Sequence, residues 1–220
     1  MNVIFKNIFF LLSISYVTQL YKIQLTEEKG ESVIPCNRTN LCYISIVFDI
    51  SSDILSNELF VDMKNILKNN ISTEIPNFTQ VSFTTFSRDI NTILNFGNFK
   101  NKDDFLEFVE SLKQSPGFIL SNVLNTVNNL ATPSTTKLST FVIISNYDKE
   151  EIANSIVYAN KLRQKGSLNF VILGRGIKPV QLLSLEPSSI YAINFDNNDT
   201  KQLTAFFYNS LSCFPENCIR

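Results

Sequence analysis

The sequence predicts a doubly wound α/β domain with a mostly parallel, six-stranded sheet, one antiparallel edge strand and helices on both faces. Apolar segments of strand length alternate with segments whose apolar residues recur at helical spacing, which favours parallel pairing through helical crossovers. Several strand segments are almost continuously apolar, as expected when helices cover both faces of a sheet. Only a Ser-Arg-Asp turn separates residues 81–86 from residues 90–96, so these two segments form a hairpin.

The strand segments are rich in β-branched and aromatic residues. Five are clear, and residues 90–96 are the weaker sixth. In chain order, the predicted strands are residues 43–49, 81–86, 90–96, 138–145, 168–173 and 190–195.

The helical segments carry apolar residues every three or four positions. The first begins behind a cap at Ser52 or Asp53, residue types that favour helix starts. A short extra helix is expected after Pro179. The apolar stripes of the longer helices span residues 55–71, 105–112, 120–127, 152–162 and 203–211.

Composition limits the function. A length of 220 residues suits one domain, and a net charge of -1 without a basic block gives no support for nucleic-acid binding. The chain contains no His, which excludes His-based triads, His-ligated zinc and imidazole bases. Any catalysis must therefore use carboxylates, Lys, Tyr, Cys or a metal.

The amino terminus has the pattern of a secretory signal. Lys6 precedes a short apolar stretch, and the small residues Ser13 and Ser15 follow it. We interpret residues 1–19 as a signal peptide, with a buried first strand as the alternative. A short polar leader over 20–42, the main domain over 43–212 and a cysteine tail over 213–220 follow. The prediction is a secreted, extracellular protein with no membrane span in the mature chain.

The four cysteines agree with secretion. They form no CxxC pair, so they predict disulfides in an oxidising compartment and not a zinc ribbon. A bridge between the two ends of the domain contributes about 5 kcal/mol in the chain-entropy model; two local bridges are the alternative. The cysteines are Cys36, Cys42, Cys213 and Cys218.

Four N-glycosylation sequons are compatible with secretion. A chain so rich in Asn, Ser and Thr contains about four by chance, so they are no evidence for it. The acceptor positions are Asn37, Asn70, Asn77 and Asn198.

Two carboxylates and two hydroxyls follow the first strand, at the sheet edge where α/β proteins usually bind ligands. Oxygen clusters of this kind suit a hard cation such as Mg²⁺. With this turn and its early hairpin, the chain resembles the von Willebrand factor type A (VWA) domain over about 43–211, which implies a Rossmann-like fold. The landmarks are Asp49-x-Ser51, Phe83-Thr-Thr-Phe86-Ser87, Gly117 before a helix containing Val123-Leu124, and Phe141-Val-Ile-Ile-Ser145 before a polar loop.

In that family, a metal-ion-dependent adhesion site combines Asp-x-Ser-x-Ser with a later Thr and a later Asp. The resemblance maps the first part to Asp49, Ser51 and Asp53, with Asp53 in place of the second Ser. It maps the Thr to Phe118 and the last Asp to Asn146. A benzyl group does not ligate a cation, and an amide lacks the charge that drives binding. The resemblance therefore implies a degenerate site.

Four alternatives concern this turn. Asp53 keeps a charge there, so a weak Mg²⁺ site supporting cation-dependent adhesion is the second hypothesis. Ser121 supplies the missing hydroxyl if the loop is shifted. Alternatively, Asp53 acts only as a helix N-cap and does not ligate a cation. A metal-dependent phosphohydrolase with Asp49 as nucleophile is the remote third hypothesis, since Ser51 stands where a second carboxylate is needed.

The resemblance implies a non-enzymatic binding module for an extracellular protein or matrix ligand, acting in adhesion or scaffolding and needing no cofactor. The expected contact surface is the carboxyl edge of the sheet. Its loops are residues 49–53, 117–121 and 146–149, and they include Ser52, Gly117, Phe118, Ser121 and Tyr147.

Overall fold

The computed structural model describes residues 43–53, 56–132, 136–173, 176–193 and 200–211. The predicted signal peptide, leader and cysteine tail lie outside the described residues, as do all four cysteines, Asn37 and Asn198. Asn70 and Asn77 are described and are both partly exposed.

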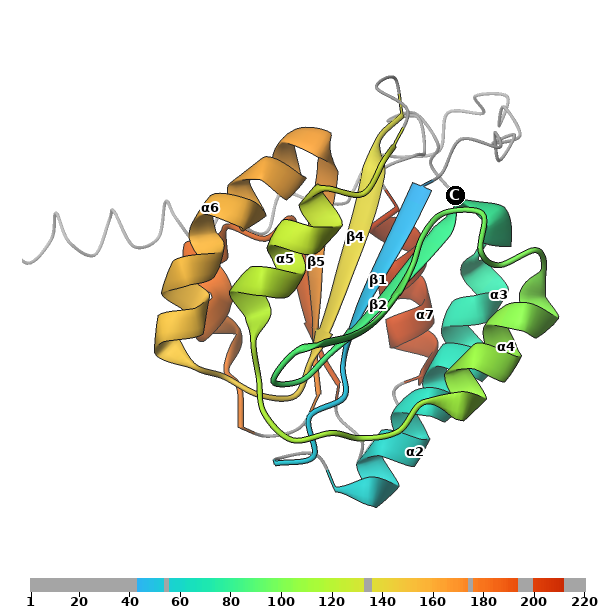
Figure 1. The fold of residues 1–220 in the computed structure, drawn as a ribbon, viewed down its shortest axis with the longest axis horizontal. Coiled ribbons are helices and arrows are strands. Elements are labelled where there is room, and N and C mark those ends of the chain that lie inside the picture. Colours follow the sequence, from blue (N-terminus) through green and yellow to red (C-terminus); the bar gives the residue numbers. More distant parts are fainter. Residues whose placement is uncertain (1–42, 54–55, 133–135, 174–175, 194–199, 212–220) are drawn as a thin grey trace, which may run out of the picture. The chain divides into compact units, whose positions relative to one another are not determined.

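The sheet has six strands in the order β3-β2-β1-β4-β5-β6 (Figure 1). Among the described strands, β2 and β3 alone pair in the antiparallel direction; the other neighbours are parallel. The predicted fold class and the antiparallel edge strand are therefore confirmed. The strands are β1 Tyr43–Asp49, β2 Val81–Phe86, β3 Ile90–Leu94, β4 Leu138–Ile144, β5 Gly166–Ile172 and β6 Ser189–Ala192.

Helices cover both faces of this sheet (Figure 1). One face packs against α2 Asn57–Ile66, the π-helical turn η1 Leu67–Ile71, α4 Lys102–Ser111 and α7 Thr200–Asn209. The other packs against α5 Leu120–Asn128, α6 Lys149–Lys165 and the 3-10 helix η3 Pro179–Leu185. The short elements α3 Ser72–Glu74 and η2 Phe78–Gln80 complete the chain before β2.

Alternation along β1 explains the two cores. Successive side chains of a strand point to opposite faces. Ile46 and Phe48 belong to the core under α2, α4 and α7, whereas Val47 belongs to the core under α5 and α6. All three side chains are fully buried, so the strand is apolar on both faces.

The predicted start of the first helix was wrong. Helix α2 begins at Asn57, and Ser56 is its N-cap, accepting a hydrogen bond from the Leu59 N–H at 3.3 Å. Asp53 does not cap the helix, because its carboxylate binds the backbone of a distant loop instead. The predicted stripe over 55–71 is divided between α2 and η1, and Leu55 lies outside the described residues.

The hairpin strand β3 is also shorter than predicted, because a turn follows Leu94 directly. Gly97 adopts a left-handed backbone with φ of 85°. Its N–H donates to the Thr79 carbonyl at 2.7 Å, which directs the chain away from the sheet. The strand therefore ends before Phe96, which packs against Tyr43 at a ring separation of 4.9 Å.

Candidate functional site

The turn after β1 is joined to the loop before α5 at the carboxyl edge of the sheet. The Ser52 N–H donates to the Ser115 carbonyl at 3.0 Å, and the Ser115 N–H donates to the Ile50 carbonyl at 2.9 Å. Ser51 and Ser115 thereby form a parallel bridge. Two segments far apart in sequence are held side by side where the family resemblance expects the binding site.

Asp49 is fully buried beneath this edge. Its Oδ1 accepts from the Ser51 N–H at 2.8 Å and contacts the Ser51 hydroxyl. Its Oδ2 accepts from the Ser145 N–H at 2.9 Å and from the Ser145 hydroxyl at 2.8 Å. Four donor groups thus occupy the four acceptor positions of the carboxylate.

Burial raises the pKa of Asp49, because a carboxylate loses water when it is enclosed; the hydrogen bonds from Ser51 and Ser145 lower the pKa and oppose this effect. No cation of the described residues forms an ion pair with Asp49. The carboxylate is held by dipoles, and it is inaccessible to a substrate.

Ser51 and Asp53 hold the two peptide groups on either side of the Gly117 Cα. The Ser51 hydroxyl lies 2.5 Å from the Gly117 carbonyl oxygen and shares its single proton between that oxygen and Asp49. The Gly117 N–H donates to Asp53 Oδ2 at 2.7 Å. Asp53 itself is exposed, so this carboxylate is the acidic group that the turn presents to solvent.

Only glycine fits at position 117. Its φ of 97° lies in the left-handed region that L side chains avoid. A Cβ there would lie 2.5 Å from the Arg88 Cβ and 2.8 Å from the Arg88 Cα. The loop therefore packs directly against the β2–β3 hairpin.

Phe118 and Ser121 take different partners from Gly117. The Phe118 ring lies 5.8 Å from the Phe86 ring and packs against the core under α5. Ser121 donates from its N–H and its hydroxyl to Glu151 Oε2 of α6, at 3.0 and 2.9 Å. Ser121 therefore bonds to α6, and Glu151 is a contributor to this edge that the sequence analysis missed.

The third loop follows β4. Asn146 Oδ1 accepts from the Tyr147 N–H at 2.7 Å, and Tyr147 is partly buried against the core under α5. Ser52, in the first loop, is exposed. The structure thus brings Asp49, Ser51, Asp53 and Gly117 together in one hydrogen-bonded group.

The arrangement of these oxygens does not fit a divalent cation. Asp49 already accepts from two backbone amides and the Ser145 hydroxyl, and it shares the Ser51 hydroxyl proton with the Gly117 carbonyl. Asn146 Oδ1 and one oxygen of Asp53 are also engaged. Mg²⁺ needs oxygen ligands in near-octahedral geometry, which this set does not supply.

A family model for the von Willebrand factor type A domain matches residues 44–214. The chain belongs to this family. No curated protein sequence matches it.

Solved structures share the VWA fold at low sequence identity. Proximal thread matrix protein 1 from the mussel byssus is 17% identical with a TM-score of 0.60, over 78% of this chain and 45% of that one. Manganese-loaded Plasmodium vivax TRAP protein is 14% identical with a TM-score of 0.59, over 78% and 75% of the two chains. The vWF domain of the Porphyromonas gingivalis pili tip protein Mfa5 is 7% identical with a TM-score of 0.57, over 76% and 95%.

Two of these relatives are described with a metal. The mussel protein has also been solved with a zinc-occupied metal-ion-dependent adhesion site, at 16% identity and a TM-score of 0.60. The TRAP structure is manganese-loaded. Our chain spans 45% of the length of the mussel protein, so the comparison concerns the VWA domain alone.

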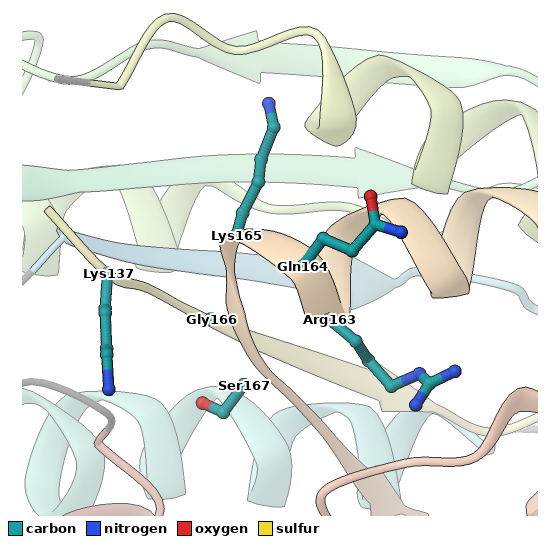
Figure 2. A pocket seen from close by; sticks show the side chains of 6 residues that line it. All are labelled: Lys137, Arg163, Gln164, Lys165, Gly166 and Ser167. Carbon is teal, nitrogen blue, oxygen red and sulfur yellow. The ribbon is translucent and has the colours of Figure 1, made fainter. Parts of the chain in front are cut away.

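A hollow of about 260 Å³ lies at the opposite, amino-terminal edge of the sheet (Figure 2). Its cations do not converge: Figure 2 shows Lys137 and Lys165 pointing to opposite sides. Lys165 binds the Asn128 carbonyl, and Arg163 pairs with Glu186 at 2.6 Å. The arrangement is therefore no ready-made anion site. Residues lining it are Lys137, Arg163, Gln164, Lys165, Gly166 and Ser167.

None of the described helices combines the length and the apolar character that a bilayer span requires.

Proposed function

We propose that this chain is a secreted, non-enzymatic VWA binding module that holds an extracellular protein or matrix component at the carboxyl edge of its sheet, without a divalent cation. The edge is the surface where α/β sheets present their loops. Membership of the VWA family, together with relatives named as a thread matrix protein and a pili tip protein, supports a role in adhesion or scaffolding.

One observation carries the metal-independent part of this proposal. The four acceptor positions of Asp49 face donors from Ser51 and Ser145, so the edge is held by hydrogen bonds inside the chain. Such a framework presents exposed groups, including Ser52 and Asp53, in a fixed arrangement. A preorganised surface loses less conformational entropy when it binds a partner.

The burial of Asp49 also argues against catalysis. A nucleophile must reach its substrate, and this side chain is fully buried. The described residues place no general base beside it, since its contacts are hydroxyls and backbone amides. We therefore favour binding over phosphate-ester hydrolysis. Secretion rests on the predicted signal peptide over residues 1–19.

The test is binding of the full chain to an array of purified extracellular matrix proteins, in EDTA and in Mg²⁺. We expect at least one partner whose binding is equal in the two buffers. Ser52→Arg should weaken that binding at least about tenfold, because it places bulk and charge on the contact surface. Gln164→Arg is the matched control, since it adds the same exposed group at the opposite edge.

Each other outcome contradicts part of the proposal. Binding that disappears in EDTA supports cation-dependent adhesion through Asp49, Ser51 and Asp53, the second candidate, which the metal-bound relatives favour. Equal loss in the Ser52→Arg and Gln164→Arg variants removes the carboxyl edge as the contact surface. The absence of any matrix-protein partner contradicts the proposed adhesive function.

A further inference from the structure

The backbone of Gly117 is bound on both sides of its Cα by one turn. Its N–H donates to Asp53 Oδ2 at 2.7 Å, and its carbonyl oxygen lies 2.5 Å from the Ser51 hydroxyl. Within the described residues, Asp53 is the acceptor recorded for this N–H. The two side chains stand two residues apart in a turn that is already bridged to Ser115.

The same loop is fixed to the β2–β3 hairpin. The Arg88 N–H donates to the Pro116 carbonyl at 3.2 Å, and the Gly117 backbone packs against Arg88 without room for a Cβ. The next residue, Phe118, packs against Phe86 at the end of β2. The loop is therefore attached both to this hairpin and to the turn after β1, and Asp53 supplies the attachment that involves a charged group.

Asp53 has no competing structural task in the described residues. Ser56 caps helix α2, so the carboxylate is not needed there. Its side chain is exposed, yet it is directed to a backbone amide 64 residues away. A carboxylate that accepts from a backbone N–H makes a charge-assisted hydrogen bond, which is stronger than one between neutral groups.

We propose that Asp53 is the positioning residue of this edge: its hydrogen bond to Gly117 orders the loop before α5 without a divalent cation. The family pattern has a second Ser at this position, and Asp53 replaces it with a longer, charged side chain that reaches the loop directly. The oxygens of Asp49 are already engaged by hydrogen-bond donors and are not free to ligate a cation. The loop is therefore held by the protein's own hydrogen bond.

This inference deepens the proposed function but is tested on the free protein. The probe is the amide hydrogen-exchange rate of the Gly117 N–H, measured by NMR in EDTA for the full chain and its variants. Asp53→Ala should raise that rate by about tenfold to a hundredfold, as expected when a charge-assisted hydrogen bond is lost. Asp53→Asn retains an acceptor oxygen and should lie closer to the parent.

Ser52→Ala is the matched control, since it truncates the exposed neighbour of Asp53 and should leave the Gly117 rate unchanged. The amide of Val142, in the buried centre of the sheet, reports whether a variant has lost global stability. A change confined to Gly117 supports the local role.

Two results overturn the inference. One is a Gly117 rate in Asp53→Ala equal to that of the parent. The other is a parent rate that falls at least tenfold when EDTA is replaced by Mg²⁺, which would assign the ordering to a cation. Neither measurement involves a partner, so loss of partner binding with Gly117 exchange as expected counts against the proposed function alone.

Discussion

Strand β1 carries two buried polar groups near its opposite ends, and they differ in how they are satisfied. At the carboxyl end, Asp49 is surrounded by four donor groups from Ser51 and Ser145. Toward the amino end, Ser45 lies in register with Ser82 on β2 and with Thr140 on β4. All three hydroxyls are buried, and none has a hydrogen-bond partner within the described part of the chain.

This difference distinguishes buried polar residues whose hydrogen bonds stabilise the structure from buried polar residues that form none. A buried hydroxyl without a partner destabilises a protein by about 1–3 kcal/mol. The hydroxyls of Ser45, Ser82 and Thr140 therefore add no hydrogen bond that stabilises the sheet. The Asp49 group instead links β1, β4 and the loop before α5. We conclude that the carboxyl end of β1 is organised by hydrogen bonds of its polar side chains, whereas the amino end of β1 is held by apolar packing.

Asp49→Ala should give the largest effect. It removes the acceptor for the Ser51 and Ser145 amides and hydroxyls, which leaves buried donors unpaired. We expect a loss of roughly 3 kcal/mol or more in the free energy of unfolding, measured by urea denaturation. Asp53→Ala, which truncates the exposed carboxylate of the same turn, should lose less than about half of that amount. Equal losses in the two variants would contradict the special role of Asp49.

Gly117→Ala should give the next largest effect. The new Cβ would meet Arg88 at 2.5 Å, in a backbone with φ of 97°. Gly97→Ala is the matched control, because φ there is 85° but nothing lies within 4 Å of the added Cβ. We expect a loss of about 1 kcal/mol at Gly97 from backbone strain, and at least twice that loss at Gly117. Thermal or urea unfolding separates the two.

The most direct comparison of the two ends uses the same substitution at each. Ser145→Ala removes a hydroxyl that donates to Asp49 at 2.8 Å and should destabilise the protein by about 1 kcal/mol. Ser45→Ala removes a buried hydroxyl that has no partner and should be neutral or stabilising by up to about 1 kcal/mol. If both variants lose the same stability, the two ends do not differ as described.

A smaller effect is expected on the pH dependence of the free energy of unfolding. Its direction is opposite at the two carboxylates Asp49 and Glu110. The pKa of Asp49 is raised above 3.8 by burial, so the folded state holds its proton more tightly than the unfolded state. The contribution of Asp49 to stability should therefore fall as pH rises from 3.8 through its raised pKa. Comparing the parent with Asp49→Asn by urea unfolding across this window isolates that change.

Glu110 is the reference for the opposite sign. Its pKa is lowered from 4.5, first by the hydrogen bond from Lys68 at 2.6 Å and then by the charge of Lys64. Its contribution is present above pH 4.5 and is lost as pH falls below that value. The group is fully exposed, so solvent screens the effect.

A parent whose advantage over Asp49→Asn grows as pH rises would contradict the direction given for Asp49.

Much of the fold follows from the sequence because its strands are apolar on both faces. Strands β1 and β2 have the predicted bounds, residue for residue. The short turn before β3 was sufficient to predict the antiparallel edge, since no crossover fits between these strands. Helix starts were less certain, because Ser52, Asp53 and Ser56 all suit an N-cap and only tertiary contacts select Ser56.

The candidate site was only partly predictable, because the partners of its side chains lie far away in the sequence. The turn from Asp49 to Asp53 is local in sequence, and its clustering of oxygens was visible. The partners of those side chains were not: Asp53 binds Gly117 across 64 residues, and Ser121 binds Glu151 across 30. That Ser45, Ser82 and Thr140 lie side by side could be recognised only from the register of the strands.

The central claim is that the carboxyl edge of this VWA domain is held by its own hydrogen bonds and not by a metal ion. Isothermal titration of Mg²⁺ and of Mn²⁺ into the full chain, freed of metal by EDTA and dialysis, tests it most directly. We predict no saturable heat of binding for either cation. Tight stoichiometric binding that Asp53→Ala abolishes would contradict the account.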